Sequence, residues 1–72
     1  MNLDLRQAII GRLNGRSTEE LQEVIEGSIG NGERTLPGLG VIFEIIWQHS
    51  EKEAQDQMVN TLMNHLPEHA KH

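Results

Sequence analysis

The sequence contains no cysteine and no tyrosine, and its 72 residues include a single Phe, a single Trp and two Pro. The lack of cysteine excludes a disulfide framework and a thiolate metal site, so neither can support the hydrophobic core. It leaves the redox compartment undetermined. A chain of this length buries only about 60% of its unfolded surface when it folds. We therefore expect one domain with a small margin of stability.

Long apolar runs are also missing. The most apolar one, Val41 to Trp47, is interrupted by Glu44. It is much shorter than the roughly 20 residues that a membrane span requires. The first residues lack the basic cluster, apolar segment and small-residue cleavage site of a signal peptide. The sequence thus predicts an intracellular protein with no membrane partner.

Basic residues are scarce, with six Lys and Arg against eleven Asp and Glu and a formal net charge of −5. Acids outnumber bases in both halves of the chain, and the only local excess of bases is Arg6, Arg12 and Arg16 against Asp4. Nucleic-acid binding depends on a positive surface that displaces counterions from phosphate. The charge balance therefore makes nucleic acid an unlikely partner.

Against this background, the segment from Leu36 to Trp47 is unusually apolar and holds the only Phe and the only Trp. Its apolar positions form two rows on a helix. The first row is Leu39, Ile42, Phe43 and Ile46, and the second is Val41 and Ile45. The pattern predicts a central helix near 37–49 with Phe43 and Ile46 facing the core. We expect other helices of the chain to wrap the second row, and the alternative is a homodimer through Val41 and Ile45.

Three further helices are expected near 3–14, 18–29 and 51–65. A capping box at Ser17–Glu20 starts the second, and a capping box at Ser50–Glu53 is predicted to start the fourth. Gly15 occupies the position of a left-handed residue that ends the first helix. Leu66-Pro67 ends the fourth. The predicted fold is an all-α, compact bundle of four short helices around a hydrophobic third helix, with one domain at 1–66 and a flexible polar tail at 67–72.

Two local features of this plan concern glycine and proline. Gly11, Gly38 and Gly40 lie inside predicted helices, where glycine is unfavourable. We interpret them as positions where a neighbouring helix approaches closely. Pro37 suits the first position of the central helix, and we expect Leu36 to lie just outside it.

Candidate catalytic and metal-binding residues are few. His65, His69 and His72 have spacings that would suit a metal on one helix, but Pro67 interrupts that helix. Ser17 and Ser50 are explained as helix caps, and the neighbouring His49 is not placed by its position to activate a serine.

Two residues of the central helix have a functional and a structural reading. Glu44, in so apolar a helix, would suit an acid or base, yet it also marks the natural solvent strip of that helix. Trp47 would suit stacking on a base or ligand, but beside Phe43 and Ile46 it is interpreted as the largest core residue.

The acidic row Glu19, Glu23 and Glu26 is interpreted as a solvated helix face rather than a site for a basic partner. We predict no catalytic residue, no cofactor and no metal.

Two segments carry a resemblance to a known family: Leu36-Pro-Gly-Leu-Gly-Val-Ile-Phe-Glu-Ile-Ile-Trp47 and the opening Leu3-Asp-Leu-Arg-Gln-Ala-Ile-Ile10. Together they resemble small, acid-soluble spore protein I of endospore-forming bacteria, over Leu3 to about Leu66. The resemblance implies a noncatalytic protein of the spore core, expressed in the forespore during sporulation, with a structural or interaction role. It names no functional residue and no partner. The alternative function is a small helical DNA-binding or regulatory interaction domain.

Overall fold

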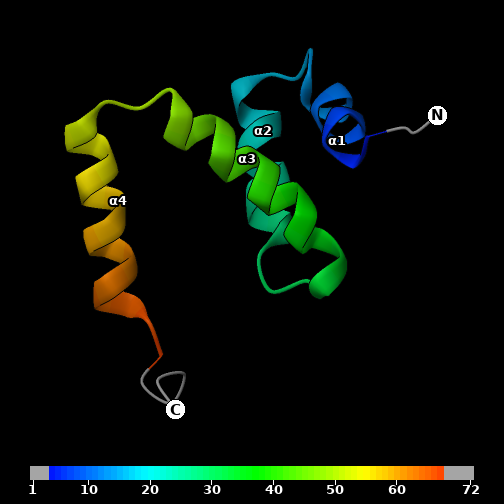
Figure 1. Cartoon of the computed structure of the whole chain (residues 1–72). Coiled ribbons are helices and arrows are strands. Elements are labelled where there is room, and N and C mark those ends of the chain that lie inside the picture. The colour runs from blue at the N-terminus through cyan, green and yellow to red at the C-terminus, as the bar shows by residue number, and fades with distance from the viewer. Residues whose placement is uncertain (1–3, 68–72) are drawn as a thin grey trace.

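The computed structural model describes residues 4–67 and contains four α-helices and one 3-10 turn. The elements are α1 (Leu5–Leu13), α2 (Thr18–Ser28), η1 (Glu33–Thr35), α3 (Leu36–Gln48) and α4 (Lys52–His65), as Figure 1 shows. No strand occurs within this range, and no helix in it is long and apolar enough to cross a membrane. The prediction of an all-α fold with four short helices around the hydrophobic third is confirmed. Position 3, the expected start of the first helix, lies outside the described residues.

The starts of α1 and α2 are fixed by side-chain caps. The backbone N–H of Arg6 donates to the Asp4 carboxylate at 3.2 Å, which satisfies one free donor of the first turn. At α2, the N–H of Glu20 donates to Ser17 Oγ at 3.1 Å, while the N–H of Ser17 donates to the Glu20 carboxylate at 3.0 Å. The first predicted capping box is therefore confirmed. Gly15 has a φ of 82°, as expected for the residue that follows the C-cap of α1.

The connection from α2 to α3 is a glycine turn that runs directly into η1. Gly30 and Gly32 adopt positive φ values of 72° and 96°, and Thr35 Oγ1 donates to the Ser28 carbonyl at 2.8 Å. Leu36 has helical angles, φ −62° and ψ −42°, so α3 begins before Pro37. The prediction that Leu36 lies outside the helix is wrong. Helical geometry is unfavourable for a residue before proline but is not forbidden. Here the chain already has helical geometry in η1 when it reaches Leu36.

The corner between α3 and α4 differs from the predicted second capping box. Ser50 Oγ donates to the Ile46 carbonyl at 2.6 Å, and the N-cap of α4 is Glu51, which makes no side-chain cap. The prediction is wrong because the hydroxyl serves the end of α3 rather than the start of α4. Two other side chains do the same: His49 Nδ1 donates to the Ile45 carbonyl at 3.0 Å and Gln55 Nε2 to the Trp47 carbonyl at 2.8 Å. Side-chain donors to the last carbonyls of α3 thus hold the corner.

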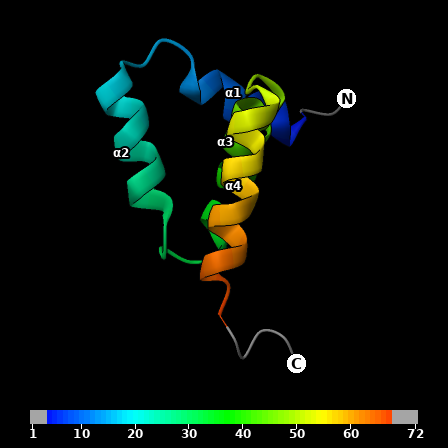
Figure 2. The same cartoon turned by 90° about the vertical axis from the view of Figure 1, so that its left-hand side faces the viewer.

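The covered side of α3 is the one that faces α1 and α2. Val41 is only 7% exposed, and it lies beside Leu5 and Ile9 of α1. Ile42 is half-buried against residues of α1 and α2. In Figure 2 these helices stand behind and beside α3, while α4 lies in front of it. Val41 is therefore covered within its own chain, as expected, and is not available for the alternative homodimer surface, whereas Ile45 of the same row is 39% exposed.

The other side of α3 is open. Phe43 is 50% exposed and Ile46 is 44% exposed. The prediction that these two side chains face a core formed by α1, α2 and α4 is wrong. The reason is geometric, because α4 leaves the corner at an angle that separates it from α3 along its length, as Figure 1 shows. Replacing a fully buried Phe by Ala lowers the free energy of unfolding by about 3–5 kcal/mol. This value does not apply to Phe43, because its side chain is half exposed.

The helical glycines do not mark close contacts. A Cβ atom added at Gly11, Gly38 or Gly40 would meet nothing within 4 Å outside its own helix. The interpretation of these positions as points of close helix approach is wrong. The predicted boundary between a domain at 1–66 and a tail remains a prediction, since residues 68–72 lie outside the described range.

Two glycines give a matched test of this backbone. Gly11→Ala should raise the free energy of unfolding by about 0.5–1 kcal/mol, because alanine restricts the unfolded chain and has room in α1. Gly15→Ala should lower it by about 1–2 kcal/mol, because its φ of 82° strains an L-residue. Urea denaturation followed by circular dichroism measures both. Equal effects at the two positions would contradict this backbone geometry.

The location of the core gives a second prediction. Val41→Ala should lower the free energy of unfolding by about 2 kcal/mol, because it removes two methyl groups from the buried position. Ile29→Ala, at an exposed position beyond α2, is the control and should change stability by less than about 0.5 kcal/mol. Thermal and urea denaturation would show the difference. A Val41→Ala protein as stable as the control would mean that this side of α3 is not the core.

Candidate functional site

The most prominent surface feature is an apolar groove between α3 and α4. It has two lobes of about 630 and 650 Å³ that share Phe43, Met58 and Leu62. One lobe adds Trp47 and Val59, and the other adds Ile46 and Ala54. We call these seven residues the α3–α4 groove. Figure 1 shows the open angle between the two helices from which it arises.

Helical spacing places these side chains on facing rows. On α3, Phe43 and Trp47 are four residues apart, and their ring centroids lie 5.7 Å from each other at an interplanar angle of 41°. On α4, Ala54, Met58 and Leu62 repeat every four residues and form the opposite row. Trp47 is therefore half-buried at the groove. The interpretation of Trp47 as the largest core residue is wrong.

Two hydroxyl groups at the edge of the groove are already hydrogen-bonded to backbone carbonyls. Ser50 Oγ donates to the Ile46 carbonyl, and Thr61 Oγ1 donates to the Gln57 carbonyl at 2.9 Å. Neither hydroxyl is paired with a base. The described lining therefore offers apolar contact area rather than a nucleophile or a general acid.

Glu44, at the edge of one lobe, is held by Arg6. Arg6 Nε and Nη2 donate to the two carboxylate oxygens at 3.1 and 3.0 Å, which joins α1 to α3. The hydrogen bond and the negative charge of Glu44 raise the pKa of Arg6. Both side chains are about half exposed, and such surface pairs contribute little to stability. Glu44 thus occupies the solvent strip of α3 and serves as a tether between helices.

The described histidines also have local partners. His65 Nδ1 donates to the Thr61 carbonyl at 2.7 Å, four residues earlier in α4. His69 and His72, the other members of the weighed metal site, lie outside the described residues. Within residues 4–67, no group of three metal-ligating side chains converges. The structure therefore does not assemble the histidine site in this part of the chain.

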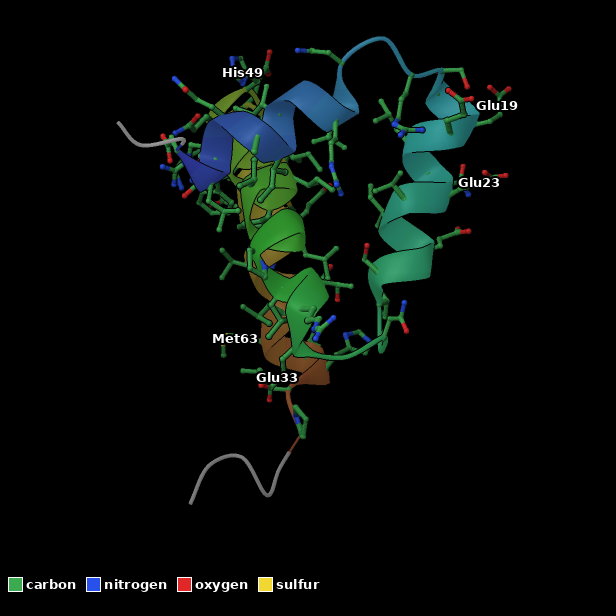
Figure 3. The ribbon with its side chains drawn as sticks, turned by 90° about the vertical axis from the view of Figure 1, so that its right-hand side faces the viewer. Glu19, Glu23, Glu33, His49 and Met63 are labelled. Carbon is green, nitrogen blue, oxygen red and sulfur yellow. The ribbon has the colours of Figure 1, made fainter. Side chains whose placement is uncertain are left out.

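The acidic row of α2 faces away from the other helices. Figure 3 shows Glu19 and Glu23 on the outer side of α2, directed away from α3. Glu26 accepts a hydrogen bond from Gln22 Nε2 at 2.9 Å, and all three glutamates are exposed. This placement agrees with the interpretation of a solvated helix face.

Comparison with known proteins decides the family. The family model for small, acid-soluble spore protein I matches residues 3–66. The chain belongs to the small, acid-soluble spore protein I family. The spore protein I of Bacillus licheniformis is 48% identical over 63 residues, which is 86% of this chain and 90% of that protein. That of Bacillus subtilis is 44% identical over 63 residues, covering 86% and 89%.

The match to spore protein I extends through nearly the whole chain. The spore protein I of Geobacillus sp. strain WCH70 is 41% identical over 71 residues, covering 97% of this chain and 100% of that protein. The name given to these relatives describes a spore protein and no enzymatic activity. No solved structure matches the chain.

The groove was not predicted from the sequence, although its elements were visible there. The two apolar rows of residues 36–47 indicated more apolar surface than one neighbour covers. The row Ala54, Met58 and Leu62 indicated a second helix with an apolar face. The sequence did not indicate the angle at the corner between α3 and α4. This angle keeps the two apolar rows apart, so that they do not pack against each other.

Proposed function

We propose that this protein is a noncatalytic constituent of the spore core, made in the forespore during sporulation, with a structural or interaction role. The observation that carries the proposal is membership of the spore protein I family over residues 3–66. The family places the chain among spore proteins of Bacillus-type endospore formers. The compartment and the role are our inference.

The arrangement of polar groups supports a noncatalytic role. Ser17 caps α2, Ser50 closes the end of α3, and Glu44 pairs with Arg6. These groups stabilise helices or hold them together, and none faces a partner group suited to proton transfer or nucleophilic attack. The described surface also carries the apolar α3–α4 groove. An interaction role therefore agrees best with the described side chains.

The location is tested by fractionating sporulating cells. We expect an antibody against this chain to detect it in forespore extracts and, after removal of the coat, in the interior of the spore. A mother-cell coat protein probed in the same fractions is the control for cross-contamination. Detection confined to the mother cell or to the coat would refute the proposed compartment.

DNA binding by the isolated protein should be negligible at physiological salt. Arg6 is paired with Glu44, Lys52 is paired with Asp56, and Arg16 Nε donates to a backbone carbonyl. The net charge of −5 opposes approach to phosphate. A gel shift with duplex DNA should show no complex, with a basic DNA-binding protein as positive control. A submicromolar affinity that falls with added salt would favour the DNA-binding alternative instead.

A further inference from the structure

A cavity lies on the covered side of α3, where α1, α2, η1 and α3 meet. Its volume is about 350 Å³, within the range of about 300–1,000 Å³ that small-molecule sites occupy. It is separate from the α3–α4 groove, because the two share no lining residue. Its wall is mostly apolar and includes Ile9, Val24 and Ile42. The cavity thus offers a small ligand apolar contact with three helices.

Two arginines line this cavity from different elements, and we call it the arginine cavity. Arg12 belongs to the last turn of α1, and Arg34 belongs to η1. No Asp or Glu is part of the described lining, and Glu33 lies outside it although it precedes Arg34 in the chain. The ion pairs within residues 4–67 include neither arginine. The wall therefore carries two positive charges that no described carboxylate balances.

The hydroxyl groups of the wall are already engaged. Ser28 Oγ donates to the Val24 carbonyl at 2.7 Å, and Thr35 Oγ1 donates to the Ser28 carbonyl at 2.8 Å. Among the described side chains of the wall, the guanidinium groups are the donors that remain for a ligand. A guanidinium group presents its N–H donors in a planar fork that matches a carboxylate. A ligand that fits this wall therefore has an anionic end and an apolar body.

We propose that the arginine cavity binds a small organic carboxylate with an apolar body. The carboxylate accepts hydrogen bonds from Arg12 and Arg34, and the apolar body contacts Ile9, Val24 and Ile42. Removal of the body from water favours binding. The two guanidinium groups distinguish the anion from a neutral molecule of the same shape, which leaves their charge unpaired. This binding does not depend on the proposed location in the spore.

The α3–α4 groove is the competing site for an apolar ligand. It is the larger of the two spaces, at about 630 and 650 Å³ for its lobes. Its described lining contains no basic residue, and Glu44 lies at its edge. A carboxylate bound there would gain no guanidinium partner. The groove therefore does not favour an anion over an alcohol with the same chain, whereas the arginine cavity does.

Nuclear magnetic resonance of the isotope-labelled full chain gives the location of a bound probe. Octanoate should shift the amide signal of Gly38 and the methyl signals of Val24 and Ile42, which line the arginine cavity. These shifts should saturate with a dissociation constant below about 1 mM. Val59 and Leu62 of the groove are the control and should shift less. Larger shifts at the two control positions, or no saturation by about 10 mM octanoate, would overturn the proposal.

Octanol tests whether the cavity recognises the charge of the probe. It has the same apolar chain as octanoate but no carboxylate. Its affinity, measured at the methyl signals of Val24 and Ile42, should be at least about tenfold lower, because it forms no charge-assisted hydrogen bond. Equal affinities of the two probes at these signals would show apolar binding alone and would overturn the proposal.

Three substitutions that each remove one positive charge give matched variants. Arg12→Gln and Arg34→Gln act in the cavity, whereas Lys52→Gln acts on α4, outside its lining. Each arginine variant should raise the dissociation constant for octanoate about fivefold or more, through loss of a charged hydrogen bond. Lys52→Gln should leave it within about twofold. All three positions are exposed, so circular dichroism should show unchanged folding. Equal effects of the three substitutions would contradict the assignment of this site.

Discussion

Helix α3 carries apolar side chains around most of its circumference, and its two neighbours α1 and α2 cover only one side of it. Val41 is buried on that side, while Phe43 and Ile46 remain half exposed on the other. A short helix packs along one row of its partner, so two rows need cover from two directions. The arrangement of the whole chain depends on how the side of α3 with Phe43 and Ile46 is covered.

The corner between α3 and α4 is the local feature that leaves Phe43 and Ile46 open. Ser50 and Gln55 donate to carbonyls in the last turn of α3, and their bonds set the direction in which α4 leaves. Satisfying free carbonyls at a helix end is a local requirement, but its consequence is global. It turns two apolar helix faces into a groove rather than a closed contact.

In this member of the spore protein I family, several described polar groups serve the helices themselves. The hydroxyls and the Glu44 carboxylate have structural partners, and the acidic row of α2 faces solvent. Apolar side chains remain exposed between α3 and α4, where removal of apolar surface from water is favourable.

The sequence by itself determined the helices, the Ser17–Glu20 capping box, the positive φ at Gly15 and the family, because each depends on residues close together in the chain. Only the tertiary structure decided which side of α3 is covered. It also decided the pairing of Arg6 with Glu44 and the use of Ser50 to close α3. Helical periodicity gives the positions of apolar rows but not the direction of the neighbouring helices, since that direction is fixed by the geometry of the connections.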